Sequence, residues 1–214
     1  MEQKYSNKTV SIICHSLLAL LVLPLLIFYK KEETLLIING HYSNLLDTLM
    51  YHITRLPELA YVLFVLALGL FTQKRFFLAV VIAMSICGLT ILLNKYLIFA
   101  DAARPLRYLT DHHIPFHHVP GIQHHSNGSF PSGHTMSAFC ALALAAFISK
   151  NKGMQFFFFL LALVSGYSRV YVAQHYLIDV YAGSIIGFTI ALITFVIFES
   201  KFVTPYWQQP VVRL

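Results

Sequence analysis

The chain alternates between long apolar runs and short polar connections. Several runs approach the roughly 20 residues that a helix needs to cross a bilayer. The pattern predicts an all-α, polytopic membrane protein that forms one domain over residues 1–214. Its six expected transmembrane helices are Val10–Phe28, Leu56–Phe71, Phe76–Phe99, His134–Ser149, Phe156–Ala173 and Leu177–Phe198, of which the second and fourth are short.

A different pattern lies between the first two runs, from Ser43 to Arg55. Apolar side chains recur there at helical spacing, opposite polar ones. This predicts an amphipathic helix lying at the membrane surface. A helix packed beneath the bundle would show the same pattern, so both interpretations stay open.

Composition agrees with a membrane protein. Of the 214 residues, 57% are apolar and only 11% are charged, and the mean hydropathy of +0.68 lies outside the range of soluble globular domains. The net charge of +6 is not a signature of nucleic-acid binding, because the cations sit at the ends of the apolar runs. We expect the membrane, and no nucleic acid, as a partner.

Two motifs carry candidate chemistry. The first is Pro131-Ser132-Gly133-His134, directly before an apolar run. Ser132 can cap the helix that begins there, and Gly133 lets the backbone approach an anion closely. The motif predicts an anion site at a helix start, although such a sequence is also typical of an ordinary N-cap.

The second motif joins Ser168-Arg169 to His175 and Asp179. On a helix, residues four apart share a face, so Asp179 can hold one ring nitrogen of His175 while the other attacks. Alone, such a pair is usually a surface contact. Both motifs, however, lie at the same end of apolar runs, which favours one shared phosphate site.

Together with Lys95 and Arg104-Pro105, these motifs resemble the three-part signature of the type-2 phosphatidic acid phosphatase (PAP2) superfamily. The resemblance implies a membrane lipid phosphatase that needs no metal or other cofactor. Lys95, Arg104, Ser132, Gly133 and Arg169 would bind the phosphate of a phosphorylated membrane lipid.

The resemblance also implies the catalytic roles. His175 would attack and form a phosphohistidine, Asp179 would orient it, and His134 would protonate the leaving oxygen. Candidate substrates are undecaprenyl diphosphate, phosphatidylglycerophosphate, phosphatidate and the lipid A phosphates. A phosphotransferase that passes the phosphoryl group to a second lipid would use the same residues.

The segment from Lys95 to Arg104, which would be the first part of the signature, departs from the family pattern. Eight residues separate Lys95 from Arg104, more than the family's usual interval. Over nine steps of about 100° an unbroken helix would place the two side chains on opposite faces. We therefore expect the helix to break near Phe99–Asp101. Otherwise Lys95 is a span-end lysine that reaches for water, and Arg107 takes its place.

Three histidine pairs lie between residues 112 and 125, at His112-His113, His117-His118 and His124-His125. Imidazole-rich tracts bind transition metals, so a histidine-rich metal-binding membrane protein is the alternative from another functional class. No acidic residue accompanies the pairs after Asp111. We expect a polar loop over a phosphate site, with no metal ligand set.

The distribution of Lys and Arg predicts the topology. One set of connections carries Lys4, Lys8, Lys74, Arg75, Lys150, Lys152, Lys201 and Arg213. The positive-inside rule makes that side cytoplasmic, with both termini inside. All motifs then face the periplasm or the outside of a cytoplasmic (inner) membrane. The short chain and the simple loops favour a bacterial membrane.

Overall fold

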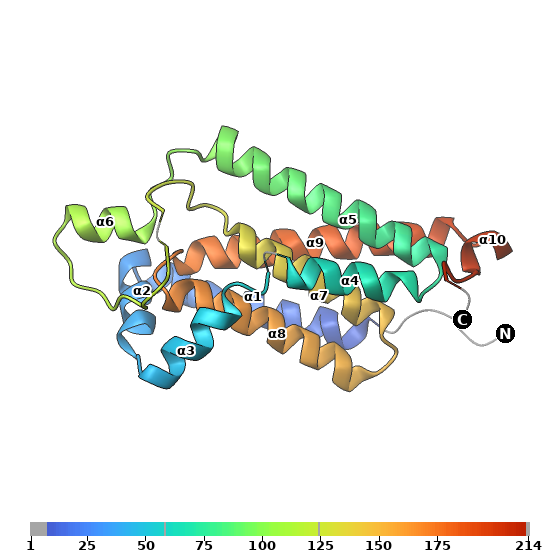
Figure 1. The fold of residues 1–214 in the computed structure, drawn as a ribbon, viewed down its shortest axis with the longest axis horizontal. Coiled ribbons are helices and arrows are strands. Elements are labelled where there is room, and N and C mark those ends of the chain that lie inside the picture. The colour runs from blue at the N-terminus through green and yellow to red at the C-terminus, as the bar shows by residue number, and fades with distance from the viewer. Residues whose placement is uncertain (1–7, 58, 124, 213–214) are drawn as a thin grey trace.

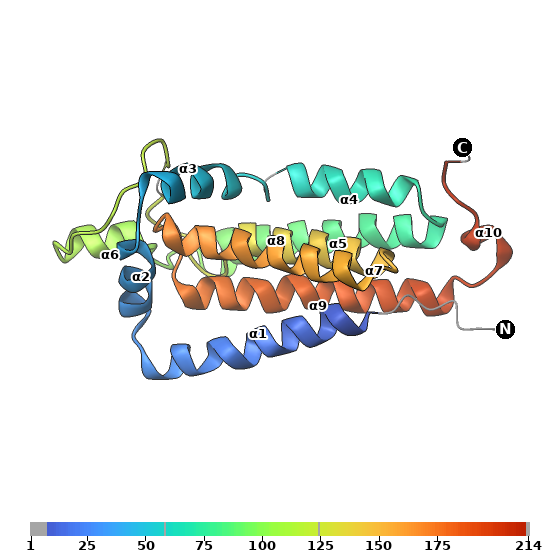
Figure 2. The same cartoon turned by 90° about the horizontal axis from the view of Figure 1, so that it is seen from below.

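The computed structural model describes residues 8–57, 59–123 and 125–212. All regular elements among them are helices, and the long ones run side by side in an elongated bundle (Figures 1 and 2). The helices are α1 (Thr9–Phe28), α2 (Lys31–Gly40), α3 (Asn44–Ile53), α4 (Ala60–Leu70), α5 (Lys74–Leu93), α6 (Pro105–Asp111), α7 (Gly133–Ile148), α8 (Lys152–Tyr171), α9 (Leu177–Lys201) and α10 (Pro205–Gln208).

Each of the six predicted apolar runs contains a helix. Among the described residues, four helices are long and apolar enough to cross a membrane: α1, α5 with its extension to Ile98, α8 and α9. The other two, α4 and α7, have 11 and 16 residues. Helix length and composition therefore give four candidate spans. That α4 and α7 also cross the membrane, which would make six spans, is a proposal.

Helix α7 forms the centre of the bundle and contacts α4, α5, α8 and α9. Nearly all its side chains are buried, and many are alanine. On α9, a Cβ added at Gly183 would lie 2.7 Å from the Ser132 oxygen, and one at Gly187 would lie 2.3 Å from the Met136 oxygen. These glycines therefore let the start of α9 approach the start of α7 at backbone distance.

The end of α5 explains the long interval between Lys95 and Arg104. After Leu93 the helix widens into a π-helix, Asn94–Ile98, and ends at Phe99, whose amide donates to the Asn94 oxygen. The predicted break near Phe99–Asp101 is confirmed. The chain then turns back, so that Arg104 and Lys95 can approach the same space.

The short helices α2, α3 and α6 gather at one end of the bundle, seen at the left of Figure 1. Helix α3 matches the predicted amphipathic segment, and its buried Met50 packs with Tyr171 and Val172. Sequence patterning predicted neither α2 nor α6. At the other end, Lys8 pairs with Glu199, which ties the start of α1 to the end of α9.

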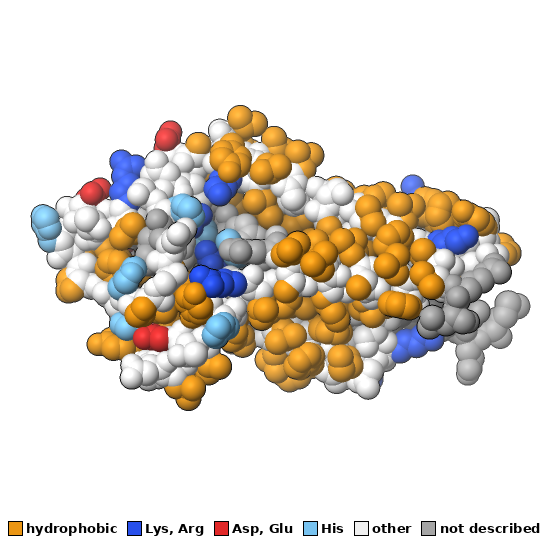
Figure 3. All heavy atoms as spheres, viewed as in Figure 1, with side chains coloured by type: hydrophobic (Ala, Val, Ile, Leu, Met, Phe, Trp, Pro, Cys, Tyr) orange, Lys and Arg blue, Asp and Glu red, His pale blue; other side chains and the backbone are white. Residues whose placement is uncertain are grey.

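The surface has two parts. On the face in Figure 3, hydrophobic side chains cover most of the bundle, histidines gather toward the end with α3 and α6, and basic residues lie toward both ends. Large apolar side chains such as Leu21, Phe28 and Leu97 are exposed along α1 and the end of α5. Apolar exposure on this scale fits contact with lipid tails.

Candidate active site

A cavity of about 650 Å³ lies where the end of α5, the start of α7 and the end of α8 meet. The turn after α3, the loop that leads to α9, residues 121–123, His125 and Gly128 complete its walls. Its polar lining includes His134, His175, Lys95, Arg104 and Arg169. These residues come from all three parts of the family signature. The structure thus brings the three separated segments together.

His175 lies in the loop between α8 and α9 and is fully buried at the cavity wall. Its Nδ1 is 3.4 Å from the carboxylate of Asp179. The predicted contact is present, but it joins a loop residue to the first turn of α9 instead of two residues on one helix face. Nε2 of His175 has no hydrogen-bond partner among the described residues. Burial lowers the pKa of His175 to about 3, with Asp179 opposing this effect and Arg104 and Arg169 adding to it. The ring is therefore neutral at physiological pH.

Asp179 is held firmly behind this ring. Its Oδ2 accepts hydrogen bonds from the Ser129 hydroxyl at 2.5 Å and from the Tyr176 amide at 3.0 Å. The Asp179 backbone oxygen accepts from the Ser132 amide at 3.0 Å, which joins the two motifs directly. Such contacts fix the orientation of a carboxylate that in turn orients an imidazole.

Arg104 is buried beside the cavity. Its guanidinium donates to the Asn127 and Gly128 backbone oxygens at 2.9 and 3.2 Å and to the Gln174 side chain at 3.0 Å. Burial lowers the pKa of Arg104, an effect that Asp179 opposes, but an arginine keeps its charge. The side chain is thus a rigidly placed cation.

Arg169 and Lys95 add two further cations. Arg169, at the end of α8, donates to the Thr54 hydroxyl at 2.5 Å. Lys95 packs against Gly128, where an added Cβ would lie 3.3 Å from the Lys95 Cγ and where φ is +65°. Because Gly128 also accepts from Arg104, it brings Lys95 and Arg104 to one wall of the cavity.

The start of α7 supplies the remaining wall. Gly133 and His134, the first two residues of the helix, line the cavity, so the positive end of the helix dipole lies there. Ser132 caps α7 as predicted, accepting from the Thr135 amide at 3.4 Å. Its side chain is fully buried and is not among the cavity-lining residues, so its contribution is to the backbone turn.

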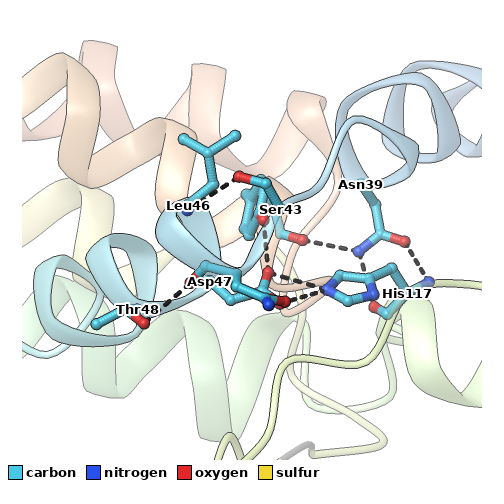
Figure 4. A network of polar contacts seen from close by, with 8 residues as sticks. Asn39, Ser43, Leu46, Asp47, Thr48 and His117 are labelled. Atoms are coloured by element: carbon cyan, nitrogen blue, oxygen red, sulfur yellow. Dashed lines mark hydrogen bonds and ion pairs between the residues drawn. The ribbon is translucent and has the colours of Figure 1, made fainter.

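The histidine pairs do not act as one group. His117 contacts Asp47 and accepts and donates backbone hydrogen bonds with Asn39, which pins the loop to α2 and α3 (Figure 4). His125 lines the cavity, where burial lowers its pKa with help from Arg104, Lys95 and Arg169. Among the residues that the structure describes, no three His, Cys, Asp or Glu side chains gather as metal ligands. His124 lies outside the described residues.

Comparison with known proteins assigns the fold and the family. The sequence model of the PAP2 superfamily matches residues 74–202, which include every motif residue described above. The chain belongs to the PAP2 superfamily. The predicted resemblance is confirmed.

Two curated PAP2 relatives come from Bacillus subtilis (strain 168). Undecaprenyl-diphosphatase BcrC is 31% identical over 161 residues, which cover 73% of this chain and 77% of that protein. Phosphatidylglycerophosphatase B is 37% identical over 75 residues, or 31% of this chain and 37% of the relative.

Two crystal structures share the PAP2 fold. LpxE of Aquifex aeolicus superposes with a TM-score of 0.65 at 23% identity, covering 76% of this chain and 92% of its own. A transmembrane PAP2-type phosphatidylglycerolphosphate phosphatase from Bacillus subtilis gives 0.58 at 21% identity, covering 93% and 98%. The helical architecture is therefore that of PAP2 membrane proteins.

Most predicted site residues meet at the cavity of this PAP2 protein, and Asp179 lies directly behind His175. Arg107 is the exception. It lies on α6, donates to the Asn127 side chain at 2.9 Å and is 3.9 Å from Asp111. Arg107 was expected at the phosphate only if the helix ran on unbroken, and the helix breaks, so Lys95 stays the proposed phosphate ligand.

Sequence analysis did not single out Arg55 or Gln174, which also line the cavity. Gln174 directly precedes His175 and accepts from Arg104, so its proximity to the motif was a usable signal. Arg55 follows the amphipathic helix, far from any motif in the sequence. Only the packing of α3 against α8 brings it to the site.

Proposed function

We propose that this PAP2 protein hydrolyses a phosphomonoester or diphosphate of a membrane lipid through a phosphohistidine. One observation carries the proposal: a neutral, buried imidazole, backed by a carboxylate, faces a cavity lined by Arg104, Arg169 and Lys95. Phosphoryl transfer needs positioning and charge neutralisation more than any other contribution, and this arrangement supplies both.

In the first step, the Nε2 lone pair of His175 attacks phosphorus, and the bond from phosphorus to the leaving oxygen breaks. Asp179 holds Nδ1 and stabilises the positive charge that develops on the ring. Arg104 and Arg169 neutralise the equatorial oxygens, and arginine suits this role because its planar fork grips two oxygens. Lys95 and the backbone amides at the start of α7 add further donors.

His134 is the proposed general acid. It lies in the first turn of α7 at the cavity wall, where it can protonate the leaving oxygen and then activate the water that releases phosphate. His134→Ala should therefore turn over poorly. With an aryl phosphate, whose leaving group needs no proton, this variant should accumulate an acid-labile phosphoenzyme. No phosphoenzyme in His134→Ala, but a stable one in His175→Ala, would reverse the two assignments.

The proposed setting is a bacterial cytoplasmic membrane crossed six times, with both termini inside and the cavity facing the periplasm or the outside. Helix polarity supports one shared face: the cavity gathers the ends of α5 and α8 and the start of α7, while Lys74, Lys152 and Lys201 lie at the opposite helix ends. A cysteine at Asn127 should react with an impermeant thiol reagent in intact cells, and one at Asn151 should not. The reverse labelling would place the site in the cytoplasm.

Phosphate release from a panel of purified lipid phosphates in detergent tests the function itself. Undecaprenyl diphosphate and phosphatidylglycerophosphate should be tested first, because the two curated relatives are named as phosphatases of these lipids. We expect activity to persist in excess EDTA and to be inhibited by vanadate, since protein groups neutralise the phosphate. Release that depends on an added lipid acceptor would instead identify a phosphotransferase.

A further inference from the structure

Arg55 is a cavity cation outside the residues that the PAP2 model matches. It lies in the turn after α3 and lines the same cavity as His175. The position is fixed from two sides. Its neighbour Thr54 accepts from Arg169, and the Arg55 guanidinium lies 4.1 Å from the centre of the Tyr51 ring. Stacking of this kind prepositions the planar guanidinium to grip two oxygens of an anion such as a phosphate.

The loop opposite secures Tyr51 in turn. Gly121 has φ +79°, and a Cβ placed there would lie 3.0 Å from the Tyr51 ring. Glycine therefore lets the loop backbone close onto Tyr51 of α3, next to the turn that carries Arg55. Gly121 and Arg55 both line the cavity, and the Tyr51 ring contacts both of them.

The charge of the cavity exceeds what one phosphate requires. Its described lining holds four permanent cations, Arg55, Lys95, Arg104 and Arg169, and no Asp or Glu. Arg104 and Arg169 are 6% and 5% exposed and lie beside His175, where they can bind the phosphoryl group under attack. A phosphomonoester carries at most about two negative charges, which these arginines already balance.

Arg55 is exposed, in contrast, and is joined to the buried pair only through Thr54. Burial lowers the pKa of His125, and Arg104, Lys95 and Arg169 add to this effect, in keeping with their shared place around one cavity. An additional cation in such surroundings is accommodated best when the ligand brings additional negative charge.

We propose that Arg55, stacked on Tyr51, binds a second phosphate of the substrate and so makes this site selective for lipid diphosphates over lipid monophosphates. The inference rests on the proposed function and narrows its substrate class. His175 would attack the terminal phosphorus, and the bond from that phosphorus to the bridging oxygen would break. The departing lipid monophosphate takes the electron pair, and Arg55 neutralises its growing charge.

Water then cleaves the phosphohistidine bond, which releases inorganic phosphate and restores His175. The products are one lipid monophosphate and one phosphate. Selectivity follows because the lipid monophosphate, once formed, no longer reaches both Arg55 and the buried arginines. The charge that Arg55 stabilises is largest on the leaving group of the transition state, so its effect belongs in kcat/KM for the diphosphate.

The test compares polyprenyl diphosphate with polyprenyl monophosphate of the same chain length, in the same detergent. For the native chain we expect kcat/KM to be at least about tenfold higher for the diphosphate. Arg55→Gln should lower that value about 10- to 100-fold and change monophosphate hydrolysis less than about threefold. Arg55→Lys should restore part of the loss, and Tyr51→Leu should reproduce part of it.

Arg107→Gln is the matched control, because Arg107 is an exposed cation of the same end of the molecule that does not line the cavity. It should leave both substrates unaffected. Retained monophosphate hydrolysis reports that Arg55→Gln is folded. Inhibition by inorganic diphosphate, relative to phosphate, should weaken in Arg55→Gln, which separates a second-phosphate contact from a contact with the lipid chain.

Equal losses on both substrates would overturn the proposal, since Arg55 would then act on binding or folding in general. No loss on the diphosphate would overturn it as well. In either case the phosphatase function stands. A native chain that hydrolyses neither substrate, nor any other lipid phosphate, would instead refute the proposed function and this inference with it.

Discussion

Two histidine–aspartate pairs lie at the same end of the bundle, and only one faces the cavity. In the pair at the cavity, Nδ1 of His175 is 3.4 Å from Asp179, and the two side chains are 1% and 3% exposed. In the other pair, Nε2 of His117 lies 2.9 and 3.0 Å from the two oxygens of Asp47, and both side chains are 16% exposed. The His117 ring also stacks on Tyr42 at 3.8 Å.

The difference lies in which ring nitrogen the carboxylate occupies and what surrounds it. Asp179 contacts Nδ1, Nε2 has no hydrogen-bond partner among the described residues, and His175 lines a cavity that also holds Arg104 and Arg169. Asp47 contacts Nε2 itself and also accepts from the Tyr171 hydroxyl at 2.6 Å. In the proposed mechanism the carboxylate of the first pair supports a nucleophile, whereas the carboxylate of the second pair ties a loop to two helices.

Replacing the two histidines should give the widest separation. His175→Ala should lower kcat at least about 10³-fold, because the bond to phosphorus can no longer form. His117→Ala should retain kcat within about threefold at temperatures where the protein is folded. Both are measured as phosphate release under saturating lipid substrate. Substantial multiple turnover by His175→Ala would refute the nucleophile assignment.

The aspartate of the cavity should have the next largest effect. Asp179→Asn keeps the shape of the side chain but removes the negative charge that stabilises the attacking ring, so kcat should fall at least about 10²-fold. KM should change little, because Asp179 does not line the cavity. A loss confined to KM would indicate that Asp179 supports substrate binding instead.

A smaller effect distinguishes the two cations considered for the first motif. Lys95→Ala should lower kcat/KM at least about tenfold if its ammonium binds a phosphate oxygen. Arg107→Ala should stay close to the native value, because Arg107 binds Asn127 and Asp111 outside the cavity. Near-normal kcat/KM in Lys95→Ala, alongside a collapse in Arg107→Ala, would restore the rejected alternative.

Sequence patterning predicted the six apolar helices because each one is a continuous apolar run, which can be recognised without knowing its packing partners. It missed α2 and α6, which are short and polar and form in the context of their neighbours. In α2, for instance, Leu35 is fully buried against Leu109 and Tyr176 from distant parts of the chain. The periodicity of a ten-residue segment carries no information about such partners.

The site was predictable where its chemistry is local in sequence. The contact between His175 and Asp179 and the cap at Ser132 are both present, although His175 lies in the loop before α9 and does not share a helix face with Asp179 as predicted. Ser132, however, is buried away from the cavity, because its hydroxyl also accepts from Thr135 at 2.9 Å. Arg55 escaped prediction since its place at the site depends on how α3 packs, which no local pattern encodes.

The smallest expected effect is on stability and concerns Asp47. Asp47→Asn weakens the hydrogen bonds from His117 and Tyr171, which join the histidine loop and α8 to α3. We expect a loss of about 1–3 kcal/mol in the free energy of unfolding, since both partners are partly buried. Thermal unfolding in detergent measures this loss. Thr48→Ala is the control on the same helix, because the Thr48 hydroxyl donates to the Asn44 oxygen within α3.

At permissive temperature Asp47→Asn should hydrolyse lipid phosphate at nearly the native rate. A fall in kcat as deep as that of Asp179→Asn, in a folded variant, would mean that the two pairs share in catalysis and that their separation into nucleophile and anchor is wrong.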